Sequence, residues 1–162
     1  MGRYREVAAL LRFLQLEPES DDLRSRLIVQ KVVYIAQSCF GIDLGYKFKW
    51  YSRGPYSRAL GREFGKVVKS LKEGLEVTEV APSVVHLQDF LRELWRVAGR
   101  VDKSEALEIA ASLIMLCRDI YPPVKDPVSE LMRRKSFLKR DVVESIWGVV
   151  KRFGCCSQEG AC

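Results

Sequence analysis

Apolar residues recur every three or four positions along most of the chain, the spacing of a helix that buries one face. Residues that end helices separate these stretches, among them Pro18, Gly41 and the Pro122-Pro123 pair. The pattern predicts seven helices, over about residues 3–16, 23–40, 55 or 57 to 71, 84–98, 102–120, 127–137 and 141–153. The second helix has the broadest apolar face, so we expect it to lie at the centre of the core.

The period changes after the second helix. Residues 46–51 alternate aromatic side chains with lysines, which predicts a half-exposed strand with its aromatic residues on the core side. Residues 75–80 alternate as well, and we expect them to pair with the first strand. The predicted fold is mainly α (α+β): a multi-helix single domain over residues 1–154 with one small two-stranded antiparallel β-ribbon. A cysteine-containing C-terminal tail, residues 155–162, follows it.

The 162 residues contain no Asn, a single Thr, and 16 Arg against 11 Lys. Loss of amide side chains and high ionic content are typical of proteins from hyperthermophiles, and we take such a source as a hypothesis. The first 16 residues interleave charges with apolar residues, which excludes a signal-peptide core. No uncharged apolar run approaches the 18 residues of a membrane span. We therefore expect a cytoplasmic protein without a membrane partner.

The chain has five cysteines. If the protein comes from a hyperthermophile, they can form disulfides inside the cell, because the cytosol of hyperthermophiles tolerates such bonds. Cys39 and Cys117 lie in apolar helical stretches, where we expect thiols buried in the core. Cys155, Cys156 and Cys162 are candidates for disulfides among themselves, to Cys39 or Cys117, or to another chain. The spacing of the cysteines does not fit a zinc site, so no metal and no cofactor are expected.

Positive charge is concentrated in one part of the chain. The net charge is +6, but residues 23–72 alone carry eleven basic and two acidic side chains. Within that segment the predicted third helix has a basic stripe opposite its apolar face, and the strand adds two lysines. The candidate binding residues are Lys47, Lys49, Arg53, Arg58, Arg62, Lys66 and Lys69.

Like charges at this spacing repel each other, so the stripe costs stability unless an anion neutralises it. A phosphate backbone is one candidate, and an acidic partner protein is another. The third is internal: residues 73–130 carry six basic and eleven acidic side chains and could fold against the basic segment.

Two motifs in the same segment resemble a known family. A helix that reads Gln30-Lys31-x-x-Tyr34 and a strand that runs into Gly54-Pro55-Tyr56-Ser57 resemble the uncharacterised YwgA-like family of bacteria and archaea. The likeness covers about residues 23–75, and more distantly it extends to the Panacea domain of antitoxins. Val29 and Ser52-Arg53 depart from the family pattern. The resemblance implies a non-enzymatic protein that neutralises a partner protein, and it carries over no catalytic residue.

The motif residues also have a physical interpretation. Gln30 and Tyr34 share a helix face, and a helix that begins after Pro55 has free backbone amides. A small polar pocket is therefore predicted around Gln30, Lys31, Tyr34, Tyr51, Gly54, Pro55, Tyr56 and Ser57. The alternative is that Gln30 and Tyr34 hydrogen-bond the turn and hold the strand against the helix.

Catalysis has no positive support in the sequence. His86 is the only histidine, and it lies inside a predicted helix between two apolar residues. No nucleophile elbow, P-loop, dinucleotide fingerprint or zinc-protease motif occurs. We therefore expect a non-catalytic intracellular binding or regulatory protein, antitoxin-like as the resemblance implies. A nucleic-acid-binding protein that uses the same basic surface is the alternative, and a structural subunit of a larger assembly is the third interpretation.

Overall fold

The computed structural model describes residues 2–75 and 79–156, and these form the mainly α fold that the sequence predicts. The α-helices are Tyr4–Leu14 (α1), Leu23–Phe40 (α2), Arg58–Lys72 (α3), Pro82–Ala98 (α4), Lys103–Ile114 (α5), Pro127–Arg134 (α6) and Arg140–Arg152 (α7). Strands Lys49–Tyr51 (β1) and Gly54–Tyr56 (β2) form one antiparallel sheet.

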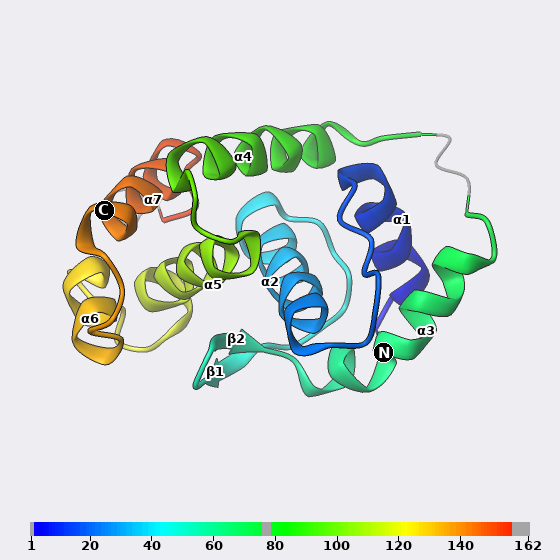
Figure 1. Cartoon of the computed structure of the whole chain (residues 1–162), viewed down its shortest axis with the longest axis horizontal. Coiled ribbons are helices and arrows are strands. Elements are labelled where there is room, and N and C mark those ends of the chain that lie inside the picture. The colour runs from blue at the N-terminus through cyan, green and yellow to red at the C-terminus, as the bar shows by residue number, and fades with distance from the viewer. Residues whose placement is uncertain (1, 76–78, 157–162) are drawn as a thin grey trace.

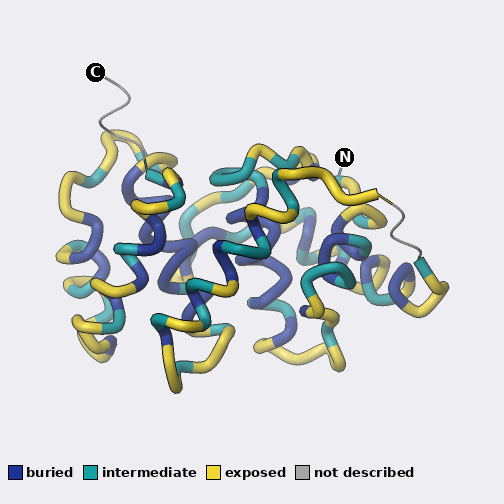
Figure 2. The backbone as a smooth tube through the Cα atoms, turned by 90° about the horizontal axis from the view of Figure 1, so that it is seen from above, coloured by how far each residue is buried: buried dark blue, intermediate teal, exposed yellow. Residues whose placement is uncertain are grey.

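Helix α2 is the centre of the core, as predicted. It runs through the middle of the molecule, with α1 and α3 towards one end and α5, α6 and α7 towards the other (Figure 1). The Asp22 carboxylate caps its first turn by accepting a hydrogen bond from the Ser25 amide at 2.8 Å, and Gly41 ends it in a left-handed conformation. Ten of its eighteen residues are buried, and buried segments fill the interior while exposed turns surround it (Figure 2).

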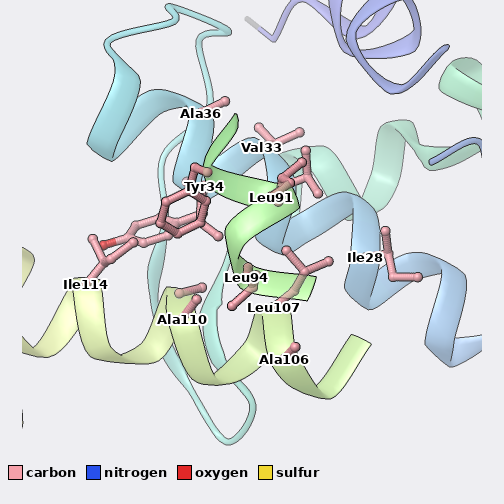
Figure 3. Packing of buried hydrophobic residues seen from close by; sticks show 14 of the residues in the cluster. Ile28, Val33, Tyr34, Ala36, Leu91, Leu94, Ala106, Leu107, Ala110 and Ile114 are labelled. Carbon is pink, nitrogen blue, oxygen red and sulfur yellow. The ribbon is translucent and has the colours of Figure 1, made fainter. Parts of the chain in front are cut away.

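The tightest packing is between α2 and α5. Side chains of α2, α4 and α5 meet in a continuous apolar cluster (Figure 3). The small residues Ala106 and Ala110 of α5 are fully buried there, beside larger residues such as Leu107 and Ile114. Alternation of small and large side chains lets two helices approach closely and fills the space between them.

Helices α1 and α3 form a second packing unit at the other end of the molecule. The Arg12 guanidinium on α1 donates hydrogen bonds to the Leu71 carbonyl at 2.5 Å and the Leu75 carbonyl at 2.7 Å. These carbonyls lie at and beyond the end of α3, where a helix leaves its last acceptors free. Helix α3 is thereby held at its C-terminal end, with its polar face towards solvent.

The predicted partner of the first strand is wrong. Strand β1 pairs with β2, in the register Lys49 to Tyr56 and Tyr51 to Gly54, so the sheet is a tight hairpin. Three residues of the expected strand, 76–78, lie outside the described residues. Gly54 makes the hairpin possible in two ways: its φ is +87°, and a Cβ there would come within 2.4 Å of the Ser112 hydroxyl. The Gly-Pro pair therefore belongs to a strand rather than to a helix start.

The expectation of core thiols at Cys39 and Cys117 is also wrong. Cys39 forms a disulfide with Cys155, and Cys117 forms one with Cys156. Helix α7 packs against α4 and α5, which places the two residues after Gly154 beside the end of α2 and the end of α5. Cys155 is fully buried and Cys156 is partly buried against the core, so the first two residues of the predicted tail pack on the domain, while Cys162 lies outside the described residues.

The end of the fifth helix differs from the prediction as well. Its α-helical part ends at Ile114, and residues Met115–Asp119 form a single π-helical turn (η1). The turn includes Cys117 and ends at Asp119, whose carboxylate accepts a hydrogen bond from the Tyr34 hydroxyl. Single π-helical turns of this kind occur where a helix must place a side chain differently from the regular spacing.

Candidate functional site

The basic stripe lies on the exposed side of α3, as its spacing predicts. Leu60, Phe64, Val67 and Leu71 point into the core, while Arg58, Arg62, Lys66 and Lys69 are exposed. At a rise of 1.5 Å per residue, the stripe runs for about 16 Å along the helix axis. Ser57 caps the helix by accepting a hydrogen bond from the Leu60 amide at 3.2 Å.

The hairpin extends this stripe beyond the start of α3. Lys47 and Lys49 are exposed, whereas Tyr46 is buried and Trp50 half-buried, which confirms the predicted alternation of burial. The strand itself is shorter than predicted, because it begins at Lys49 and not at residue 46. A cavity of about 410 Å³ opens at the junction, and both lysines and Arg58 line it together with Tyr51, Tyr56 and Ser57. We call Lys47, Lys49, Arg58, Arg62, Lys66 and Lys69 the basic face.

No residue of the basic face forms an ion pair with any part of the chain that the structure describes. Lys66 has one favourable contact of another kind, since its ammonium lies 5.5 Å from the centre of the Tyr4 ring. Glu63 is the acidic residue of α3, and its carboxylate accepts a hydrogen bond from the Tyr46 hydroxyl at 2.7 Å. The acid nearest in sequence therefore already has a partner.

Internal neutralisation occurs, but on α2 and not on the basic face. Arg24 pairs with Asp102 at 3.1 Å, and Arg26 pairs with Asp21 at 2.5 Å. The hydrogen bond from Arg26 lowers the pKa of the Asp21 carboxyl below its usual value. Of the three candidates for neutralising the basic segment, folding of residues 73–130 against it thus supplies Asp102 to Arg24, whereas the partner of Arg26 is the local Asp21, and neither pair involves the basic face.

Arg53 does not belong with the other basic candidates. The hairpin tip carries it into a separate cavity of about 440 Å³, shared with Glu105 and Glu108 of α5 and with the end of α6. Because β1 and β2 pair directly, residues 52 and 53 form the turn and point away from the start of α3. The grouping predicted from sequence is wrong at this position.

Gln30 holds the hairpin against α2. Its amide oxygen accepts a hydrogen bond from the Ser57 amide at 2.8 Å, and its amide nitrogen donates one to the Ser57 carbonyl at 2.9 Å. Gln30 and Ser57 are both buried, so these bonds satisfy backbone groups that water cannot reach. The alternative interpretation of Gln30, as a brace for the turn, is confirmed.

Lys31 and Tyr34 do not line the predicted polar pocket. The Lys31 side chain is fully buried beneath the hairpin, and its ammonium donates a hydrogen bond to the Pro55 carbonyl at 2.6 Å. Tyr34 is buried too and donates to Asp119, so it braces the end of α5 and not the turn. Of the eight expected pocket residues, three line the cavity at the start of α3: Tyr51, Tyr56 and Ser57. Gln30 and Lys31 lie behind its wall. Gly54 and Pro55 form the buried part of the strand beside it.

A pair of charges that the sequence analysis did not single out lies near Lys31. Glu108 on α5 and Lys135 after α6 form an ion pair in which both side chains are mostly buried. Nothing in the sequence indicates that Glu108 is buried, because glutamates are mostly exposed unless they are paired. Burial lowers the pKa of Lys31 to about 8; the charge of Glu108 opposes this shift, while Lys135 and Arg53 add to it.

The buried ammonium predicts a pH dependence of stability. Between about pH 8 and pH 10, folded Lys31 holds fewer protons than Lys31 in the unfolded chain, so the free energy of unfolding rises with pH. We expect a gain of about 2 kcal/mol across this window. Above about pH 10 a second effect opposes this gain in stability. Tyr34 and Tyr46 lose their protons there in the unfolded chain but keep them in the folded protein, because burial raises their folded pKa values.

Urea unfolding at pH 7.5, 8.5 and 9.5, with free thiols blocked, measures this effect. Lys31→Met is the comparison, because it keeps the length of the side chain and removes the charge, and its stability is expected to stay flat across the window. A wild type whose stability falls from pH 8.5 to 9.5, or a Lys31→Met variant with the wild-type slope, would contradict the assignment.

The described residues contain neither a metal-binding cluster nor a membrane-spanning helix. Within residues 2–75 and 79–156, no group of three or more His, Cys, Asp or Glu side chains is arranged to hold a metal ion. In the same residues, no helix combines the length and the apolar character that crossing a membrane requires.

Comparison with known proteins adds no relative. No family model matches the chain, and no curated protein or solved structure is significantly similar to it. The resemblance to the YwgA-like family therefore rests on the two motifs alone. What the structure adds to them is a physical role, because Gln30 and Lys31 of the helix motif bind the backbone of Pro55 and Ser57 in the strand motif.

Proposed function

We propose that this protein is a non-catalytic binding protein that docks nucleic acid on its basic face. The observation that carries the proposal is the absence of any acidic partner for six exposed cations within the described part of the chain. Gathering like charges on one surface is unfavourable in the free protein. A polyanion relieves this repulsion and gains the entropy of the counterions that it releases.

The composition of the surface favours nucleic acid over an acidic partner protein. Stable protein interfaces have an apolar centre within a polar rim, whereas nucleic-acid interfaces are polar and positively charged. The large apolar side chains that are exposed in the described residues are Leu23, Val80, Val85, Tyr121 and Phe137. None of them belongs to β1, β2 or α3, so the basic face has no largely exposed apolar side chain to form such a centre.

The antitoxin-like role implied by the family resemblance is the second candidate. It requires an acidic protein on the same face, and the motif residues support it only through the resemblance. For either role we propose a cytoplasmic location. With two disulfides, this location depends on the hyperthermophile hypothesis, because the cytosol of mesophiles keeps thiols reduced.

A salt series on the wild-type protein tests the proposal. Fluorescence anisotropy measures binding to random-sequence duplex and single-stranded DNA and RNA of 20 nucleotides at 50 to 300 mM salt. We expect micromolar affinity at about 50 mM salt, and a logarithmic slope of about −4 to −5 if five or six phosphates are neutralised. Polyglutamate serves as an acidic comparator with the charge but not the phosphates.

The outcomes separate the two candidates. Steeply salt-dependent binding of nucleic acid that exceeds binding of polyglutamate supports the proposal. Equal affinity for polyglutamate, or no binding of any nucleic acid at 50 mM salt, overturns it.

A further inference from the structure

The cavity at the start of α3 has cations as the charged residues of its described wall. Lys47, Lys49 and Arg58 line it, and no acidic side chain is among the described residues of its wall. The other large charged cavity, at the hairpin tip, contains two glutamates, one of them already paired with Lys135. Three cations around one hollow without a carboxylate favour an anion that carries more than one charge.

Backbone donors add to these cations. The amide of Leu60 binds the Ser57 hydroxyl, but the amides of Arg58 and Ala59, both in the cavity wall, donate no hydrogen bond within the described residues. They point out of the first turn of a fifteen-residue helix, where the helix dipole also favours negative charge. The three cationic side chains and the first turn of α3 thus border the same cavity.

The wall of the cavity is held in place before any ligand binds. Gln30 binds both backbone groups of Ser57, and Lys31 binds the carbonyl of Pro55. Tyr56 lies across the sheet from Lys49, and its ring packs edge-to-face on that of Tyr51 with 5.5 Å between the centroids. A site of fixed shape loses less entropy when it binds a ligand than a flexible one does.

We propose that this cavity binds a phosphate monoester, the terminal phosphate of a nucleic-acid strand whose chain then follows the basic stripe of α3. The inference rests on the proposed function and names the part of the ligand that the cavity selects. A monoester carries about −1.5 to −2 charges at neutral pH, whereas a backbone diester carries −1. Three cations therefore match a strand end better than a position within the strand, and the tyrosine rings offer flat surfaces to the terminal nucleoside.

Strands that differ only at their ends test this inference. Anisotropy competition compares one 12-nucleotide single strand in three forms: with hydroxyls at both ends, with a 5′-phosphate and with a 3′-phosphate. One of the two phosphorylated forms is expected to bind about tenfold more tightly than the hydroxyl form, the effect of one or two charge-assisted hydrogen bonds. Inorganic phosphate at millimolar concentration should remove the advantage and leave the hydroxyl form bound.

The matched variants are Lys47→Gln/Lys49→Gln in the cavity and Lys66→Gln/Lys69→Gln on the far part of the stripe. Both remove two charges, but only the first should abolish the preference for a phosphorylated end, while both weaken binding of the hydroxyl form. Equal binding of all three strands, a preference that survives in Lys47→Gln/Lys49→Gln, or tighter binding of a phosphoserine peptide than of either phosphorylated strand overturns the inference. If no strand binds at all, the proposed function itself is wrong.

Discussion

Replacing Cys155 and Cys156 with alanine removes both disulfides and is expected to lower the free energy of unfolding by more than about 4 kcal/mol. The two bridges join residues 116 and 39 positions apart in the chain. In the chain-entropy account, loops of these sizes restrict the unfolded state by about 4–5 kcal/mol each when taken alone. The closed loops overlap in sequence, so the two contributions are not fully additive.

Thermal unfolding followed by circular dichroism measures the effect. For a chain of this length 1 kcal/mol corresponds to about 2–4 °C, so a fall in Tm on the order of 10 °C or more is expected. Reductant should lower the wild-type Tm towards that of the double variant and leave the variant unchanged. Cys162→Ser is the control, and it should keep the wild-type Tm.

Thiol counting provides an independent check of the same bridges. Four of the five cysteines are bonded to each other, so alkylation of the unfolded, unreduced protein should modify no more than one thiol per chain. Modification of three or five thiols, together with a Tm that does not respond to reductant, would show that Cys39 and Cys117 are the buried thiols that the sequence suggested.

The sequence predicts helices well where local signals mark both ends. Helix α2 begins and ends at the predicted residues because Asp22 supplies a cap and Gly41 a left-handed stop. The basic stripe of α3 is predicted for a similar reason, since a spacing of three to four residues determines which side chains share a face. Both features depend on contacts within a few residues of each other.

The features that the sequence did not predict depend on long-range contacts. Gly54-Pro55 is compatible with a helix start and with a strand, and the contacts that accompany the strand come from distant residues: Ser112 beside Gly54, and Lys31 at the Pro55 carbonyl. Cys39 and Cys155 approach each other because α7 folds back along α4 and α5, which no local pattern encodes. Gln30 and Tyr34 share a helix face, yet one contacts the hairpin and the other contacts η1.

The second large effect is expected from reversing charge on the basic face. Arg58→Glu/Arg62→Glu/Lys66→Glu replaces three unpaired cations on the exposed side of α3. Each lost phosphate contact reduces the salt slope by about 1, and the new glutamates repel the backbone as well. We therefore expect nucleic-acid affinity at 50 mM salt to fall at least about 100-fold.

A matched control distinguishes loss of a site from loss of net charge. Arg100→Glu/Lys125→Glu/Lys139→Glu changes the net charge by the same amount. It alters three exposed side chains that lie outside the basic face and form no ion pair within the described residues. Equal Tm values for the two variants would show that both remain folded. The control should lose less than about tenfold in affinity, since distant charges act only through a screened field.

The salt slopes of these three proteins, measured side by side on one duplex, test the central claim most directly. The account predicts a slope of about −5 for the wild type, a similar slope for the control variant, and a slope about 3 smaller in magnitude for the α3 variant. Equal slopes for the two triple variants would contradict it, because nucleic acid would then respond to the total charge of the protein and not to a surface built by α3 and the hairpin.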